Sequence, residues 1–323
     1  MPTTATAPAF ATLTALGANT GGRVDARLTP AQVTSFVDNG FCWVSQLIKP
    51  AEIAELKADL IKLARGGYVC EQLKPARADA TDQEVLDSIL CIHQPHFISE
   101  IMKKYCEHPA IAGVLSQIIG AHLAHWDGAV KCMQSMLFMK GPGKPGQAWH
   151  QDEQYIPTRD RSLCGAWIAL DDATISNGCL WVVPGSHRNG YFFQRRTPQD
   201  LEEYDGSDQC YGFDEAQAVP VEVPAGSVVF FNGYLLHKSL KNRSQGYRRV
   251  LVNHYMNAWS LLPWGPQEGV NIAQTDDRTV LQVAGTDPYA WKGTKQAPNL
   301  VYLRGWGKVW EGDKAATEVQ KPR

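Results

Sequence analysis

Two histidines and one aspartate are spaced in this chain so that they could hold a metal ion together. His150 and Asp152 are two residues apart, so in an extended segment both side chains leave the same face. A second histidine, His237, lies far along the chain, near the end of an apolar run. Two histidines and one carboxylate on one face of an octahedron, with the other positions open, form the facial triad of non-haem Fe(II) oxygenases. The His-x-Asp pair alone is weak evidence, but together with His237 it predicts an Fe(II) site.

Length and composition favour one large globular domain and no strongly charged partner. The chain has 323 residues, 44% of them hydrophobic, which suffices for a substantial core. Its formal net charge is −2 and its Lys and Arg residues are scattered, so we expect no nucleic-acid surface and no membrane-binding patch. No apolar run reaches membrane-spanning length. The eight cysteines have no zinc-like spacing and are expected to be mainly small buried hydrophobes in a reducing compartment.

The chain divides into a short lead and one domain. Residues 1–25 are rich in Ala and Thr but lack a basic start and a continuous apolar stretch, so we expect a disordered lead and not a signal peptide. Residues 26–323 are expected to form a single, soluble, cytoplasmic domain. Up to about residue 128 the pattern is mainly helical, with capping residues and Gly or Pro punctuation. Helices are predicted to begin at Pro30, after Pro50, near Thr81 (running through Leu90) and at Pro109.

From about residue 129 to residue 258 the pattern is one of short strands. Apolar and polar residues alternate over 130–140, which predicts that Gln134, Met136 and Lys140 share one face with Cys132. The polar and aromatic segment 190–217 is expected to be a long loop near the mouth of a pocket. Further strands are predicted over 41–44, 165–170, 179–183, 219–223, 227–231 and 248–256. We therefore expect a mainly β fold with α-helical bracing, in which a double-stranded β-helix (a cupin-like jelly roll) follows N-terminal helices and precedes a C-terminal extension.

Five stretches resemble the phytanoyl-CoA dioxygenase family of Fe(II)/2-oxoglutarate-dependent oxygenases. They occur in the family's order over roughly residues 28–258. The stretches are WHQD at 149–152, GAWIALD at 165–171, NGCLWVVPGSH at 177–187, HKS at 237–239 and NRSQGYRR at 242–249. Together they are far more specific than any one of them.

The resemblance implies a cosubstrate site beside the metal. His150, Asp152 and His237 would hold Fe(II) and leave three positions for two oxygens of 2-oxoglutarate and for O₂. Arg248 would bind the far carboxylate of 2-oxoglutarate, because a guanidinium fork matches a carboxylate with two parallel hydrogen bonds. Arg249 is the alternative if the strand register is shifted by one, although the family spacing favours Arg248. The other positions expected at the cosubstrate are Ser239, Trp167, Met136, Lys140 and, as a neighbour on the Met136 face, Gln134.

The implied reaction is the hydroxylation of an unactivated C–H bond in a small organic molecule, with release of succinate and CO₂. Halogenases of this broad group replace the ligand carboxylate with a small residue, so Asp152 predicts oxygenation and not halogenation. Phytanoyl-CoA itself would favour a concentrated basic patch, which the sequence lacks, so a smaller metabolite is expected. Position alone suggests the substrate-facing residues Tyr155, Ile156, Arg188, Phe192, Tyr234 and His96.

Two other functions are weighed against this one. A cupin-type iron enzyme that does not use 2-oxoglutarate predicts a His-x-His pair and no carboxylate-binding arginine, whereas the chain has His-x-Asp and Arg248. A non-catalytic metal-binding or sensing protein should have lost one of the key residues, and none is lost. The expected partner is a small-molecule substrate, and the sequence leaves open whether the protein is a monomer or a homodimer.

Overall fold

Two antiparallel sheets face each other in the computed structural model, which describes residues 27–73, 75–261, 280–293 and 301–306. The predicted lead, residues 1–25, lies outside the described residues. The major sheet has the order β1 (Phe41–Val44), β10 (Val228–Asn232), β5 (Cys164–Ala169), β12 (Arg248–Asn257), β3 (Val130–Lys140), β2 (Ile89–His93) and β14 (Tyr302–Gly305), and β13 (Leu281–Ala284) also pairs with β3. The minor sheet is β4 (Gln147–His150), β11 (His237–Ser239), β6 (Leu180–Val182) and β9 (Val219–Val221), and a separate hairpin joins β7 (Gln194–Arg196) to β8 (Gln209–Tyr211).

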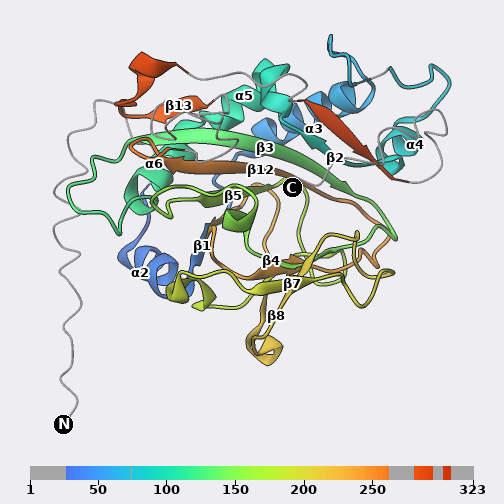
Figure 1. The fold of residues 1–323 in the computed structure, drawn as a ribbon. Helices are drawn as coiled ribbons and strands as arrows, with labels where there is room; N and C mark the ends of the chain where they lie inside the picture. Colours follow the sequence, from blue (N-terminus) through green and yellow to red (C-terminus); the bar gives the residue numbers. More distant parts are fainter. Residues whose placement is uncertain (1–26, 74, 262–279, 294–300, 307–323) are drawn as a thin grey trace, which may run out of the picture.

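The helices cover the outer face of the major sheet. They are α2 (Pro30–Asn39), α3 (Pro50–Ala64), α4 (Asp82–Asp87), α5 (Glu100–Cys106) and α6 (Pro109–Ile118). In Figure 1, α3 and α5 lie on the opposite side of β3 and β12 from β4 and β7. This is the expected architecture, a jelly-roll core braced by N-terminal helices.

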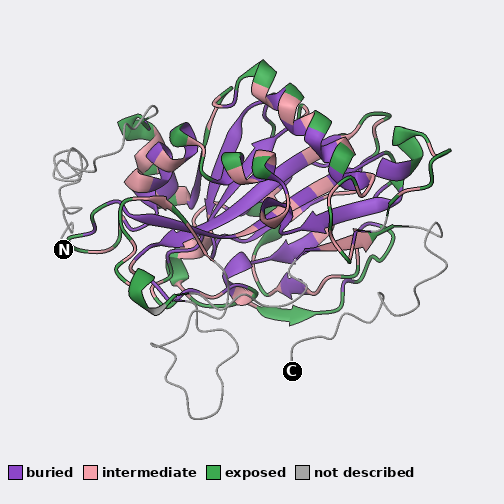
Figure 2. Ribbon diagram, turned by 90° about the horizontal axis from the view of Figure 1, so that it is seen from above, coloured by how far each residue is buried: buried purple, intermediate pink, exposed green. Residues whose placement is uncertain are grey.

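Each face of the major sheet packs against an apolar layer. On the helical side, Leu60 and Tyr105 are buried in one cluster with Leu251 of β12. On the inner side, Val250 of β12 packs in a second cluster with Val182 of the minor sheet. Figure 2 shows that the strands are mostly buried, whereas exposed residues lie on the outer helices and loops. The inner layer is where the two sheets hold the candidate site between them.

Local signals set the helix limits well but miss several elements. The α2 and α4 helices both begin with the predicted capping boxes, at Thr29 and Thr81. The prediction that the second of these runs through Leu90 is wrong, because α4 ends at Asp87 and Ile89–His93 forms β2. Its first four residues are apolar and all five are buried, so the periodicity of this run cannot distinguish a buried strand from a helix. The sequence patterns also missed α5, and they assigned the β7–β8 hairpin to a loop.

The predicted alternation along β3 breaks near its start. His254 of β12 lies opposite Gln134, but the next residue, Tyr255, lies opposite Cys132, so one extra residue sits in β3. Such a β-bulge reverses the facing of the residues on one side of it. Cys132 therefore packs in the helix-side core, whereas Met133 packs in a small cluster on the other side. The prediction that Cys132 shares a face with Met136 is wrong for this reason.

Two further features of the described residues bear on the sequence expectations. All eight cysteines are free and all but Cys70 are buried, as expected for small apolar side chains. Burial raises the pKa of Cys42 to about 12, so this thiol stays protonated. No helix in the described ranges is long and apolar enough to cross a membrane.

Gly146 allows the strand that carries His150 to approach its partner closely. A Cβ atom at Gly146 would lie 1.9 Å from the carbonyl oxygen of Ser239 on β11. We expect Gly146→Ala to lower the free energy of unfolding by about 1 to 3 kcal/mol, as overpacked interiors do. Urea denaturation of the two proteins measures this difference.

Gly246→Ala is the matched control. Gly246 has no heavy atom near its Cβ position and no positive φ, so its replacement should change the free energy of unfolding by less than about 0.5 kcal/mol. Equal stability losses in the two variants would contradict the close approach at Gly146.

Candidate metal centre

The two candidate histidine ligands face each other across a strand pair. His150 ends β4 and His237 begins β11, and they are direct partners in the antiparallel register. Side chains of directly opposed residues leave the same face of a sheet, only a few ångströms apart. The two imidazole rings accordingly have centroids 4.0 Å apart, and both side chains are buried. Strand pairing thus joins two residues that are far apart in the sequence.

Asp152 completes the group because the chain stays extended for one residue beyond β4. Gln151 has φ −125° and ψ 124°, and a 3-10 turn begins at Asp152. One carboxylate oxygen, Oδ1, lies 3.4 Å from His150 Nε2 and 3.5 Å from His237 Nε2. Neighbouring donors around a metal bound at about 2.1 Å would lie about 3 Å apart, close to these separations. These three residues form the group in the described ranges that could hold a metal ion.

The surrounding hydrogen bonds leave the metal-facing atoms free. Nδ1 of His150 lies 2.7 Å from the carbonyl oxygen of Ala148, and Nδ1 of His237 lies 2.9 Å from that of Leu235. A carbonyl accepts only from N–H, so both rings carry their proton on Nδ1 and present the Nε2 lone pair to the centre. This is the hydrogen-bonding pattern of metal-binding histidines.

His254 provides the corresponding support for the carboxylate. Its Nε2 lies 3.0 Å from Asp152 Oδ2, the oxygen that faces away from the other two histidines. With Oδ2 engaged, Oδ1 remains as the free donor of Asp152. His254 comes from β12 of the major sheet, so both sheets contribute to the centre.

The electrostatics of the three residues suit a cation. Burial alone would raise the pKa of Asp152, but the imidazoles of His237, His150 and His254 outweigh it and hold this pKa well below its usual range. Burial, with His150 nearby, lowers the pKa of His237 to about 4. Near neutral pH the aspartate is therefore ionised and His237 is neutral, the forms in which both bind metals.

A second polar cluster with two cations lies between the sheets. Lys140 of β3 and Arg248 of β12 are direct cross-strand partners, and both are buried. Lys140 donates to Ser239 Oγ at 2.8 Å and to the Leu240 carbonyl at 2.7 Å. The guanidinium of Arg248 lies 5.5 Å from the centre of the Trp167 ring, and its Nε has no hydrogen-bond partner within the described part of the chain.

Burial acts strongly on both cations. It lowers the pKa of Arg248 to about 10, and burial together with Arg248 holds the pKa of Lys140 well below its usual range. Like charges directly opposite each other destabilise a sheet, and a buried charge without a counter-ion is costly. This cluster is therefore complementary to an anion.

The strand register decides which arginine faces inward. Arg249 points to the other side of β12, where its Nε and Nη2 donate to the two carboxylate oxygens of Asp171 at 2.8 and 2.7 Å. Arg248, one residue earlier, lines the space between the sheets. Their different environments follow directly from the two-residue period of the strand.

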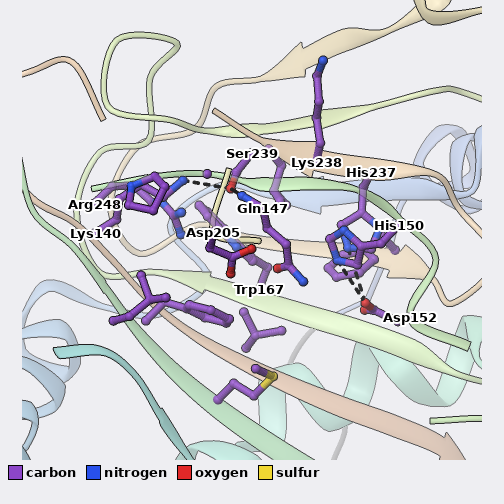
Figure 3. Close-up of a pocket in the computed structure, with 18 of the residues that line it drawn as sticks. Lys140, Gln147, His150, Asp152, Trp167, Asp205, His237, Lys238, Ser239 and Arg248 are labelled. Atoms are coloured by element: carbon purple, nitrogen blue, oxygen red, sulfur yellow. Dashed lines mark hydrogen bonds and ion pairs between the residues drawn. The ribbon is translucent and has the colours of Figure 1, made fainter. Parts of the chain in front are cut away.

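One cavity connects the metal centre with the cationic cluster (Figure 3). It has a volume of about 710 Å³, part of which is open to solvent. Eight of the nine residues expected at the metal or the cosubstrate line it, and Gln134 is not among its lining residues. The eight are His150, Asp152, His237, Arg248, Ser239, Trp167, Met136 and Lys140.

The residues expected to face a substrate do not line this cavity. Tyr155 is 44% exposed, with its ring centre 6.4 Å from that of His150, and the rings of Phe192 and Tyr234 stack with centres 5.0 Å apart. The other three residues have contacts elsewhere in the fold. Ile156 is in an apolar cluster with Met133, the exposed Arg188 lies 3.7 Å from a carboxylate oxygen of Asp38, and the buried His96 is hydrogen-bonded to Ser135, next to the helix-side core.

The lining residues that were not identified from the sequence include Phe138, His254, Gln147 and Asp205. Phe138 shares the face of Met136 and Lys140 and could have been found from the same alternation. His254 lies six residues after Arg248 on the same strand, but no ligand spacing singled it out. Gln147 and Asp205 also line the cavity. Asp205 comes from the segment expected to be a loop, where no periodicity predicts the direction of a side chain.

This chain is similar to several known proteins. The chain is 34% identical over 177 residues to "Phytanoyl-CoA dioxygenase 1" of Oryza sativa subsp. japonica. The matched stretch covers 53% of this chain and 60% of the rice protein, so this chain spans about three fifths of that relative's length. Two solved structures share the fold. The epimerase SnoN in complex with Fe3+, alpha ketoglutarate and nogalamycin RO has 18% identity and a TM-score of 0.55, covering 80% of this chain and 96% of that one. EctD from S. alaskensis with 2-oxoglutarate and 5-hydroxyectoine has 22% identity and a TM-score of 0.56, covering 79% and 86%. A family model described as phytanoyl-CoA dioxygenase matches residues 36–250, and this chain therefore belongs to the phytanoyl-CoA dioxygenase family.

Proposed function

We propose that this protein is an Fe(II)- and 2-oxoglutarate-dependent oxygenase that hydroxylates an unactivated C–H bond of a small organic molecule. One observation carries the proposal. A cavity with a His-Asp-His group at one end has the buried pair Lys140 and Arg248 elsewhere in its wall. Such a cavity offers a metal and a carboxylate site to the same small molecule.

The cationic pair is the argument for a dicarboxylate. Lys140 has two hydrogen-bond acceptors, but the buried Arg248 lacks a partner for its Nε among the described residues. A bound carboxylate would neutralise the pair and accept a charge-assisted bond from the guanidinium. A molecule that also carries oxygen donors for a metal at its other end would fill both sites, and 2-oxoglutarate has this form.

The chain's own residues then have distinct tasks. His150, His237 and Asp152 would hold Fe(II) through Nε2, Nε2 and Oδ1. Arg248, Lys140 and Ser239 would hold the distal carboxylate, and the side chains of Trp167, Met136, Phe138 and Val252 would form walls that exclude water. When bound, Fe(II), 2-oxoglutarate and O₂ supply the oxidising chemistry, in which 2-oxoglutarate is converted to succinate and CO₂. Excluding water strengthens the charged contacts and protects a reactive oxidant from side reactions.

The relatives support this class of reaction and leave the substrate open. The SnoN structure is in complex with alpha ketoglutarate and the EctD structure with 2-oxoglutarate. SnoN is described as an epimerase and the similar SnoK as a carbocyclase, so members of this fold carry out different reactions. Asp152 keeps the carboxylate ligand, which favours oxygenation over halogenation. A cupin-type enzyme that does not use 2-oxoglutarate would have no carboxylate ligand for the buried side chains of Arg248 and Lys140.

The first test is anaerobic. Fe(II) and then 2-oxoglutarate are added to the purified protein, and the weak visible charge-transfer band of a chelated Fe(II)–2-oxoglutarate complex is followed. We expect the band in the parent and its loss in Asp152→Ala. In Arg248→Ala we expect 2-oxoglutarate affinity to fall about 100-fold, because a charge-assisted bidentate contact of about 3 kcal/mol is removed.

Arg249→Ala is the matched control for Arg248→Ala. It removes the same charge one residue away, where the guanidinium pairs with Asp171 on the other side of β12, so 2-oxoglutarate affinity should stay within about twofold of the parent. If the parent shows no band anaerobically and forms no succinate in air, the oxygenase proposal is wrong.

A further prediction concerns His254, which holds the outer oxygen of Asp152. We expect His254→Ala to weaken metal binding by about 10- to 100-fold, as the loss of such supporting bonds does. Isothermal titration with Co(II), without 2-oxoglutarate, measures the affinity. His254→Gln, whose amide can still donate to the carboxylate, should recover part of it, and His122→Gln is a control at an exposed histidine. Unchanged Co(II) affinity in His254→Ala would show that Asp152 needs no support from this residue.

A further inference from the structure

An acidic side chain lines the cavity that also contains the two cations. Asp205 is one of the lining residues, and Figure 3 shows its carboxylate in the cavity between Gln147 and Trp167. Its charge reaches Lys140, where it opposes the lowering of the lysine pKa by burial and by Arg248. A carboxylate at this place would repel a dianionic ligand and compete with it for the two cations.

Backbone hydrogen bonds hold Asp205 in the wall of the cavity. Its N–H donates to the Gly146 carbonyl at 2.9 Å, and the Gly146 N–H donates to the Glu203 carbonyl at 2.7 Å. The side chain of Glu203 in turn accepts from the Lys241 N–H at 2.8 Å and pairs with Arg243 at 2.6 Å. The loop is thus joined both to the residue just before β4 and to the segment that follows β11. The carboxylate of Asp205 stays in the wall and needs a counter-ion there.

Arg304 supplies that counter-ion from the C-terminal strand. Its Nη2 lies 3.1 Å from Asp205 Oδ2, while Oδ1 accepts from the Ser207 hydroxyl at 2.6 Å and the Ser207 N–H at 3.1 Å. The side chain of Asp205 is only 5% exposed, whereas that of Arg304 is 34% exposed, so the carboxylate is shielded from water and the arginine reaches it from the surface. Arg304 is on β14, opposite Cys91 of β2, and lies beyond residues 36–250, which the family model matches.

We propose that Arg304 is a positioning residue that sets the affinity of the cavity for its dicarboxylate by holding and neutralising Asp205. Without Arg304 the carboxylate of Asp205 stays in the cavity wall with its charge uncompensated, and it competes with the ligand's own charge for Lys140 and Arg248. With Arg304 in place, both cations remain available. The C-terminal strand thereby controls cosubstrate binding without touching the cosubstrate, and this inference rests on the proposed use of 2-oxoglutarate.

The test is anaerobic titration of the Fe(II)-loaded full-length protein with 2-oxoglutarate, in the parent and in four variants. We expect Arg304→Gln to weaken 2-oxoglutarate binding about tenfold, within the range measured for coupled charges in contact. Asp205→Asn should bind at least as tightly as the parent. The double variant Asp205→Asn/Arg304→Gln should return to within about threefold of Asp205→Asn, because no carboxylate is left to neutralise.

Arg243→Gln is the fourth variant and the matched control. Arg243 pairs with Glu203 in the same loop as Asp205. The charge of Glu203 also acts on Lys140, but neither Arg243 nor Glu203 lines the cavity, so 2-oxoglutarate affinity should change much less than in Arg304→Gln. Co(II) affinity, measured by calorimetry without 2-oxoglutarate, should be equal in the parent and in Arg304→Gln. This second readout separates cosubstrate binding from damage to the metal centre.

Three results would contradict the proposed role of Arg304. An unchanged affinity in Arg304→Gln overturns the inference. So does a loss that the double variant fails to restore, or an equal loss in Arg243→Gln, because these results mean that Arg304 only holds the loop together. If the parent itself does not bind 2-oxoglutarate, the proposed function fails and this inference fails with it.

Discussion

The candidate site depends on the antiparallel pairing of β4 with β11. This pairing puts His150 directly opposite His237, and a shift of one residue would turn one of the two rings to the other face of the minor sheet. The absence of a side chain at Gly146 allows the two strands to come this close. The same pairing brings Ser239 beside the residue that precedes Ala148, since the Gln147 N–H donates to the Ser239 hydroxyl at 3.2 Å. One short strand pair thus positions groups for both the metal centre and the cationic cluster.

The major sheet supplies the opposite wall, and its polar residues are placed by register. β12 contributes Arg248 near one end and His254 six residues later, and the two side chains serve different parts of the same cavity. The β-bulge in β3 occurs opposite the step from His254 to Tyr255. It allows the inner face to keep Met136 and Lys140 while Cys132 joins the helix-side core. The fold therefore combines a well-packed outer core with a polar, partly open inner layer.

Electrostatic balance links these parts. The metal centre has an ionised aspartate beside neutral histidine, which favours a cation, whereas the pair Lys140 and Arg248 favours an anion. Both preferences arise from burial, which makes an unbalanced charge costly. Asp205 adds a negative charge to the same cavity, and Arg304 compensates it from outside the stretch that the family model matches. The family's matched residues and this chain's own C-terminal strand thus act on one cavity.

The sequence by itself determined the family and the fold class, and it identified eight of the residues that line the cavity. Local signals sufficed there, because capping boxes and two-residue alternation depend only on neighbouring residues, and because His150 and Asp152 are linked by one extended residue. Local patterns could not reveal β2, whose mainly apolar run is buried on both faces, nor the bulge that turns Cys132 toward the helix-side core. The family spacing favoured Arg248 over Arg249, and the strand register of the tertiary structure turns Arg248 toward the cavity. Tertiary structure alone placed Ile156, Arg188 and His96 away from the cavity wall. It also brought Asp205 and Arg304 together across 99 residues of chain, and no local pattern encodes such a contact, because it exists only once β14 has paired with β2.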